Sequence, residues 1–397
     1  MDEERNNASD ASEQKESGRV KVGIRERLKH FTWAWFTSTM STGGLALVLA
    51  LTPHQFRGLY TIGVIVYLFN IGLFLTLCTC MTLRYIFSPQ HFKRSFLHPP
   101  EAFFFGSFWL SVCVILSGTQ IYGVTYGPCG EWLKTTLRIL YYIYAALSLI
   151  NSIQQYWVFI TWTPFHSHLH PFTPAWFLAG YSSMLTGTLA SLLSGTQPPE
   201  HRLPIIVSGL AYQGFGWLLS SLLLVLYLSN LLEKGLPPPA VRPGMFIPVG
   251  SAAYTIVVLM GLSRAIPEDY GYFAAHPGAA DTLQTMALFV SVFLWLFAFY
   301  LFAIAVLACL STLMTPSRLP FALPWWAFVF PNVGFTLATV DIGRELGSEG
   351  ILWVGSVMTV LLVVMWIVTA VMCVRAVVLG KICWPGKDED REMFKDD

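Results

Sequence analysis

The stretch from Phe321 to Leu337 reads FALPWWAFVFPNVGFTL. It is apolar enough for a bilayer, yet it carries Pro331, Asn332 and Gly334 near its middle. Proline lacks a backbone donor and kinks a helix, and in lipid the freed carbonyl must find another partner or line a cavity. Interrupted membrane helices are typical of transport pathways. The stretch therefore predicts either a simple proline kink or part of a permeation path.

Composition places the chain in a membrane. Of its 397 residues, 54% are hydrophobic and 12% are charged, against roughly 25% charged in soluble domains, and the mean hydropathy is +0.57. We interpret it as an all-α polytopic membrane protein with the lipid bilayer as its surroundings. No basic patch indicates a nucleic-acid partner, and no catalytic or nucleotide-binding motif occurs. We therefore expect neither an enzyme nor a cofactor.

Ten segments are long and apolar enough to span a membrane, which takes about 20 residues. They predict a transmembrane domain over residues 31–380, between polar tails at 1–30 and 381–397. An even number of spans puts both termini on one side. Lysine and arginine are more frequent in the loops of that side, which indicates the cytosol. The segments are 31–51, 60–87, 101–122, 133–161, 172–195, 204–232, 244–264, 282–314, 320–342 and 351–380.

The odd-numbered segments are shorter, and each contains glycine or proline close to a small polar residue. We infer five helical hairpins, each an inner helix broken in its middle followed by a longer outer helix. The inner helices would surround a pore lined by hydroxyls and backbone; packing is the alternative use of such glycines. The candidate pore residues are Ser41, Thr42, Gly43, Gly44, Gly106, Ser107, Gly180, Tyr181, Ser182, Gly250, Ser251, Pro331 and Asn332.

Charged side chains are rare inside the predicted spans. Arg84, Arg138 and Arg264 stand near helix ends, where we expect their side chains to extend to the membrane surface. Arg344 follows the ninth segment on the external side, and we expect it to meet permeating anions. Glu101 precedes the third segment and is expected to cap that helix.

Phe330 directly precedes Pro331 and is the candidate gate of the pore, since aromatic residues can plug a constriction. The alternative is that Phe330 packs against lipid or a neighbouring helix. A second feature is the tract His166, His168 and His170 in the loop after the fourth segment. Because no carboxylate or cysteine stands nearby, we expect a solvated loop there and no metal site.

Eight stretches together resemble a known family, in register over residues 21–390. The family is that of the fungal malic acid transporters, C4-dicarboxylate permeases of the tellurite-resistance/dicarboxylate transporter family. It also includes plant slow-type anion channels. The stretches are HFTWAWFTSTMSTGGL (30–45), HPPEAFFFGSFWLS (98–111), PAWF (174–177), MLTGTLAS (184–191), LPIIVSGLAYQGFGW (203–217), RPGMFIPVG (242–250), WWAFVFPNVGFTLAT (325–339) and WPGKDED (384–390).

The resemblance implies a fold, an assembly and a substrate. The fold is ten transmembrane helices in five hairpins with quasi-fivefold symmetry around a central pore, usually assembled as a homotrimer. The family's gating phenylalanine lies in the ninth helix and matches Phe330. The implied substrates are C4-dicarboxylates such as malate, succinate and fumarate. We expect a multi-pass protein of the plasma membrane with both termini cytosolic.

The chain departs from malate permeases at three pore positions. Those permeases carry prolines at the third, fifth and seventh breaks, where this chain reads FFGSF (104–108), FLAGYSS (177–183) and VGSAAYT (249–255). Glycine can supply the bend, but the added tyrosine and serines change pore width and hydrogen bonding. An efflux channel for small inorganic anions such as sulfite, nitrate or chloride is therefore the alternative. A membrane sensor or scaffold is a third hypothesis, against which the short tails argue.

Overall fold

We describe the protein from a computed structural model over residues 23–161, 172–313 and 320–384. The histidine tract at His166, His168 and His170 and most of both predicted tails lie outside this range. The regular elements within it are all helices: α2 (Ile24–Lys29), η1 (Trp33–Trp35), α3 (Phe36–Leu51), α4 (Leu59–Phe87), α5 (Gln90–Leu97), α6 (Pro99–Ala102), α7 (Phe105–Thr119), η2 (Gln120–Thr125), α8 (Glu131–Thr161), η4 (Pro174–Trp176), α9 (Phe177–Leu193), η5 (Ser194–Thr196), α10 (Pro199–Lys234), η6 (Pro239–Phe246), α11 (Val249–Arg264), α12 (Tyr272–Ala275), α13 (Ala279–Leu313), η7 (Leu323–Phe328), α14 (Phe330–Glu345) and α15 (Glu349–Val378).

Five short helices alternate along the chain with five long ones. Helices α3, α7, α9, α11 and α14 have 15 to 17 residues, whereas α4, α8, α10, α13 and α15 have 29 to 36. In the described residues, nine helical segments are long and apolar enough to cross a membrane. Helix α9 is not one of them, because its serines and threonines lower its hydropathy. The protein is polytopic, as its composition predicts.

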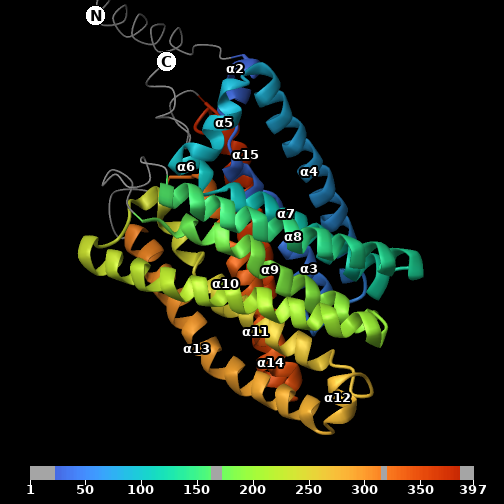
Figure 1. Ribbon diagram of the computed structural model, residues 1–397. Coiled ribbons are helices and arrows are strands. Elements are labelled where there is room, and N and C mark those ends of the chain that lie inside the picture. The colour runs from blue at the N-terminus through green and yellow to red at the C-terminus, as the bar shows by residue number, and fades with distance from the viewer. Residues whose placement is uncertain (1–22, 162–171, 314–319, 385–397) are drawn as a thin grey trace, which may run out of the picture.

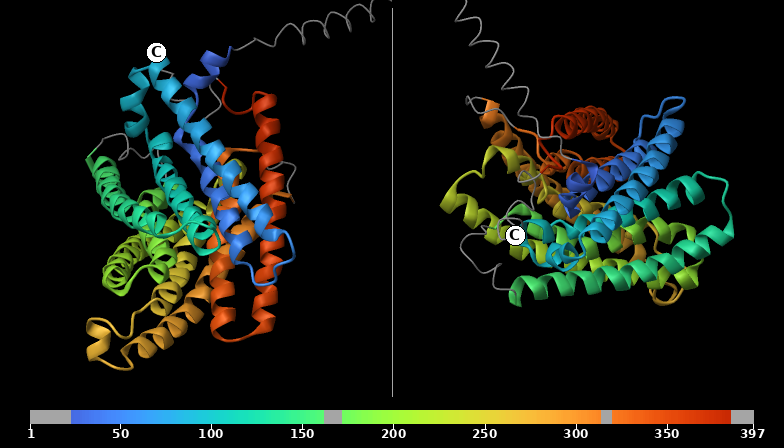
Figure 2. Two further views of the ribbon diagram at one scale, coloured as in Figure 1. Left: turned by 90° about the vertical axis from the view of Figure 1, so that its right-hand side faces the viewer. Right: turned by 90° about the horizontal axis from the view of Figure 1, so that it is seen from above.

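The short helices lie inside and the long helices outside (Figure 1). Helices α4 and α13 run along opposite sides of the molecule, and the turned view places α15 at one edge and α8 and α10 at the other (Figure 2). In four of the inner segments 61% to 94% of the most apolar stretch is buried, against 22% to 39% in the five long helices. The exposed faces of the long helices carry leucine, isoleucine, valine and phenylalanine, which suits a surface in contact with lipid.

The five inner helices contact one another in a closed order. Helix α3 packs against α7, α7 against α9, α9 against α11, α11 against α14, and α14 against α3. The short segments that precede them also meet, since η6 contacts both η4 and η7, and η7 contacts η1. The N-terminal ends of four inner helices therefore lie close together.

The breaks in the inner segments lie at the starts of the inner α-helices, where each follows a shorter helical turn of 3 to 8 residues. Helix α3 runs without interruption across Gly43 and Gly44, so the predicted break at this pair is wrong. The change from 3-10 to α-helix occurs at Phe36. Pro331 is the second residue of α14, where the missing backbone donor costs nothing because first-turn donors have no partner within the helix. The proline therefore starts this helix and does not kink it.

One arginine that the sequence predicts to extend to the membrane surface, Arg84, is paired inside the protein. Arg84 and Glu101 are both fully buried and form a two-pronged ion pair. The predicted capping role of Glu101 is wrong, because the helices beside it have no side-chain cap. Arg264 binds the carboxylates of Asp341 and Glu345. The prediction for Arg84 fails because it meets a carboxylate from another helix, which composition does not reveal. The Arg264 side chain is 30% exposed at the end of α11, so its prediction is not contradicted.

The two described ends of the chain meet on one side of the molecule. Arg27 of α2 donates to the carbonyl oxygens of Val377 at 2.8 Å and Cys383 at 3.2 Å. The Cys383 thiol donates in return to the Arg27 carbonyl at 3.2 Å. This arrangement agrees with an even number of spans.

Candidate permeation site

A stacked aromatic pair lies at the centre of the inner helices. The ring of Phe330, at the start of α14, stacks on Tyr254 of α11 with a centroid distance of 5.3 Å and an interplanar angle of 29°. The Tyr254 hydroxyl donates to the Phe330 carbonyl at 3.1 Å. Phe330 is 2% exposed and Tyr254 3%. The pair is thus fixed by both a stack and a hydrogen bond.

Glycines of the neighbouring helices make room for these rings. A methyl group at Gly44 of α3 would lie 3.3 Å from Phe330, and one at Gly334 would lie 2.8 Å from Tyr254. At Gly250 it would be 3.4 Å from Tyr181 and 3.7 Å from Tyr254. Larger side chains at these positions would displace the rings. Helices α3, α9, α11 and α14 therefore converge on one aromatic cluster.

A cavity of about 240 Å³ lies on one side of this cluster. Its walls come from the C-terminal halves of α3, α9, α11 and α14, and Tyr254 is one of its lining residues. Thr188 and Ser191 of α9 add hydroxyls, and Leu47, Val257 and Leu337 add apolar wall. The cavity thus leads from the ends of the inner helices to the aromatic pair.

Four charged groups gather where these helices end. Arg264 donates to Asp341 Oδ1 at 2.8 Å and to Glu345 Oε2 at 2.9 Å. Arg344 donates to the carbonyl oxygen of Leu51 at 2.6 Å, which ties α14 to α3. Arg264, Asp341 and Arg344 line the cavity. Two cations and two anions cancel, so the entrance carries no formal excess charge while Arg344 still presents a cation to the cavity.

Six of the predicted site residues belong to this region. Gly44, Tyr181, Gly250, Phe330 and Pro331 cluster around the stack, since a methyl group at Gly250 would lie 3.8 Å from Pro331. The Tyr181 hydroxyl donates to the carbonyl of Ile247 at 2.9 Å, joining α9 to the residues before α11. Arg344 lies at the cavity. Sequence reasoning therefore found one side of the stack and its surroundings.

The predicted hydroxyls have hydrogen-bond partners within the protein. Ser41 donates to the Trp326 carbonyl at 3.0 Å, Ser107 to the Trp33 carbonyl at 3.0 Å, and Ser251 to the Pro248 carbonyl at 2.7 Å. Thr42 accepts from the indole of Trp366 of α15 at 2.9 Å, and Ser182 accepts from Asn151 of α8 at 3.1 Å. These hydroxyls bond to backbone or to outer helices.

Three further predicted residues serve contacts between helices. Gly43 faces Val114 and Asn70, Gly106 faces the backbone of Leu178, and Gly180 faces Leu219. Small residues let helices approach closely in membranes, which was the alternative interpretation of these glycines. Asn332 lines a separate cavity on the other side of α14.

Sequence reasoning missed Tyr254 and Asp341. Tyr254 follows Gly250 by four residues and so lies on the same face of α11, a spacing that would have pointed to it. The predicted pore residues all lie within two positions of a glycine or proline of the sequence, and Tyr254 does not. Nothing in the sequence indicates the pairing of Asp341 with Arg264.

Comparison with known proteins identifies the family. A family model described as voltage-dependent anion channel (SLAC1) matches residues 30–374. The chain belongs to this family. The family resemblance inferred from the sequence is therefore confirmed, and the family consists of channels and transporters.

The names of similar proteins refer to the transport of an organic or an inorganic anion. This SLAC1-family chain is 35% identical over 372 residues to the malic acid transport protein of Schizosaccharomyces pombe, covering 93% of this chain and 83% of that protein. A putative malic acid transport protein of the same organism is 30% identical over 373 residues, covering 93% and 85%. The sulfite efflux pump of Trichophyton rubrum is 26% identical over 351 residues, covering 87% and 91%.

Proposed function

We propose that this protein carries C4-dicarboxylate anions, with malate as the reference substrate, through a pore enclosed by the five inner helices. The observation that carries the proposal is the similarity to malic acid transport proteins along nearly the whole chain. The closed order of contacts among α3, α7, α9, α11 and α14 supports it. In this proposal the ten helices form five hairpins with quasi-fivefold symmetry.

Phe330 is the gate in this proposal. Its ring and Tyr254 separate the cavity from the meeting point of the short segments η1, η4, η6 and η7. An apolar constriction stops ions by excluding water, and two stacked rings provide one. Opening requires the Phe330 ring to leave Tyr254.

Weak electrostatic attraction suits fast permeation, because tight binding slows exit. Arg344 offers a cation at the cavity, while Arg264 is neutralised by Asp341 and Glu345. On the other side of the gate the N-terminal ends of inner helices converge, and helix N-termini attract anions. An anion would thus meet mild attraction on both sides of the constriction.

Topology and assembly follow from the same proposal. The lysine and arginine bias of the loops supports cytosolic termini, and the contacts of Arg27 with Val377 and Cys383 keep both ends together. A plasma-membrane location would let an inside-negative potential favour anion exit by about 2.3 kcal/mol per charge per 100 mV. We further propose a homotrimer with one pore per subunit.

Efflux of small inorganic anions is the second candidate function. It is favoured by the similarity to sulfite efflux pumps. A flux assay in proteoliposomes with labelled malate, succinate, sulfite and nitrate at fixed voltage separates the two. Transport of sulfite or nitrate without malate would reject the first candidate.

A further inference from the structure

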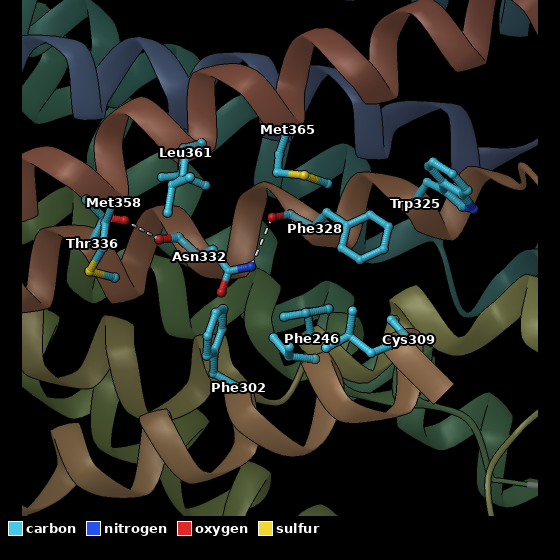
Figure 3. A pocket seen from close by; sticks show the side chains of 13 residues that line it. Phe246, Phe302, Cys309, Trp325, Phe328, Asn332, Thr336, Met358, Leu361 and Met365 are labelled. Carbon is cyan, nitrogen blue, oxygen red and sulfur yellow. Dashed lines mark hydrogen bonds between the residues drawn. The ribbon is translucent and has the colours of Figure 1, made fainter. Parts of the chain in front are cut away.

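A second cavity lies away from the aromatic pair, between α13, α14 and α15 (Figure 3). Its volume is about 490 Å³, within the range of small-molecule sites of roughly 300–1,000 Å³. Aromatic and sulfur-bearing side chains make up about half of the walls, which gives flat faces beside adaptable ones. They include Phe246, Phe302, Trp325, Phe328, Met358 and Met365.

The cavity opens on the surface that faces lipid. Leu310 of α13 and Leu361 of α15 belong to its lining, and they are 49% and 58% exposed. Both lie among the exposed apolar side chains of the two long helices. A molecule dissolved in the bilayer can therefore enter between α13 and α15 without crossing water.

One polar atom in the wall has no partner in the described part of the chain. Asn332 is 8% exposed, and its amide oxygen has no hydrogen-bond donor. Its amide nitrogen donates to the Phe328 carbonyl at 2.9 Å, which fixes the orientation of the amide. Figure 3 shows the oxygen turned toward Phe302 inside the pocket. A buried acceptor without a donor is costly, so a ligand that supplies a donor is favoured.

The other polar groups of the pocket are already satisfied. The Thr336 hydroxyl donates to the Asn332 carbonyl at 2.8 Å, and the Trp325 indole donates to the Pro320 carbonyl at 3.0 Å. No charged side chain is among the lining residues. A phosphate or carboxylate head group would therefore enter without a counter-charge, and a plain acyl chain has no donor to offer.

We propose that this cavity binds a membrane sterol, with its single hydroxyl donating to the amide oxygen of Asn332 and its ring system between the aromatic and methionine walls. A rigid apolar body loses less conformational freedom on binding than an acyl chain does. The bound hydroxyl would contact α14 two residues after Phe330. The site is separate from the proposed pore, so it does not depend on the identity of the transported anion.

The test measures binding of labelled cholesterol to the full-length protein purified in sterol-free detergent, in competition with its 3-ketone. Oxidation of the hydroxyl to a ketone removes the donor and leaves the ring system nearly unchanged. We expect the ketone to bind about 10-fold more weakly, as for the loss of one buried hydrogen bond. In Asn332→Leu the two molecules should bind with equal affinity.

Two variants of α13 test whether the sterol enters through the opening of the cavity. Leu310→Trp places an indole in the opening and should lower sterol binding about 10-fold or more. Leu307 lies on the same helix, is 65% exposed and is not part of the cavity lining. Leu307→Trp should therefore leave sterol binding unchanged. Equal binding of sterol and ketone by the wild-type protein would overturn the proposal even if Asn332→Leu fails to fold. Photolabelling by a sterol probe outside α13 to α15, or a second copy of the chain crosslinked over the opening, would also overturn it.

Discussion

Replacing Phe330 by alanine should open the pore. The substitution removes a ring that is 2% exposed and stacks on Tyr254 at 5.3 Å. It keeps the Phe330 carbonyl, so the hydrogen bond from Tyr254 remains available. The change therefore tests the ring itself and leaves the backbone contact of α14 in place.

The structure sets the size of the effect. An aromatic pair contributes about 0.5–1.5 kcal/mol beyond the area it buries, and 1.4 kcal/mol is a tenfold change in an equilibrium. Because the ring is also the proposed obstacle, we expect anion flux to rise about tenfold or more. A buried phenylalanine replaced by alanine usually costs about 3–5 kcal/mol of stability.

The assay is initial malate flux into proteoliposomes at equal protein content and fixed voltage. Phe335→Ala is the matched control, since Phe335 is equally buried on the same helix but packs on Trp295 at 5.4 Å and Phe302 at 5.6 Å, toward α13. It should lose comparable stability without a rise in flux. Unchanged or lower flux in well-folded Phe330→Ala, or an equal rise in both variants, would refute the gate.

Further predictions concern the partner of the gate, the cavity and the buried ion pair. Tyr254→Phe keeps the stack but loses the hydrogen bond to Phe330, worth about 1 kcal/mol, so flux should rise about fivefold, and an unchanged flux would count against this bond. Arg344→Ala should raise the half-saturating anion concentration about tenfold in the same assay, with lysine restoring most of the affinity; wild-type affinity in the alanine variant would reject its role. Glu101→Gln leaves Arg84 as a buried charge without its anion, which should lower stability by about 3–5 kcal/mol, seen as earlier thermal unfolding, whereas an unchanged midpoint would contradict the importance of the pair.

The architecture could be predicted from the sequence to a large extent. Length and apolarity gave the segments, and the alternation of short and long segments gave the inner and outer helices. Gly44 and Gly250, two of the predicted pore residues, lie next to the aromatic cluster. These features depend on local composition, which the sequence displays directly.

The direction in which side chains of the inner helices point could not be predicted from the sequence. An inner helix such as α3 is buried on nearly all sides, so apolar periodicity does not tell which face points to the centre. Thr42 therefore looked like a pore residue although it bonds to Trp366 of an outer helix. The pairing of Arg84 with Glu101 likewise depends on how the connection through α5 folds back, which no spacing rule reports.

The most direct test of the central claim is the selectivity of the opened pore. Currents through reconstituted Phe330→Ala would be recorded at fixed voltage and pH while malate, succinate, sulfite, nitrate and chloride are exchanged in turn. Our account predicts that malate and succinate carry current, and that Arg344→Ala in the same background weakens it. Conduction of the inorganic anions alone would contradict the proposed dicarboxylate function.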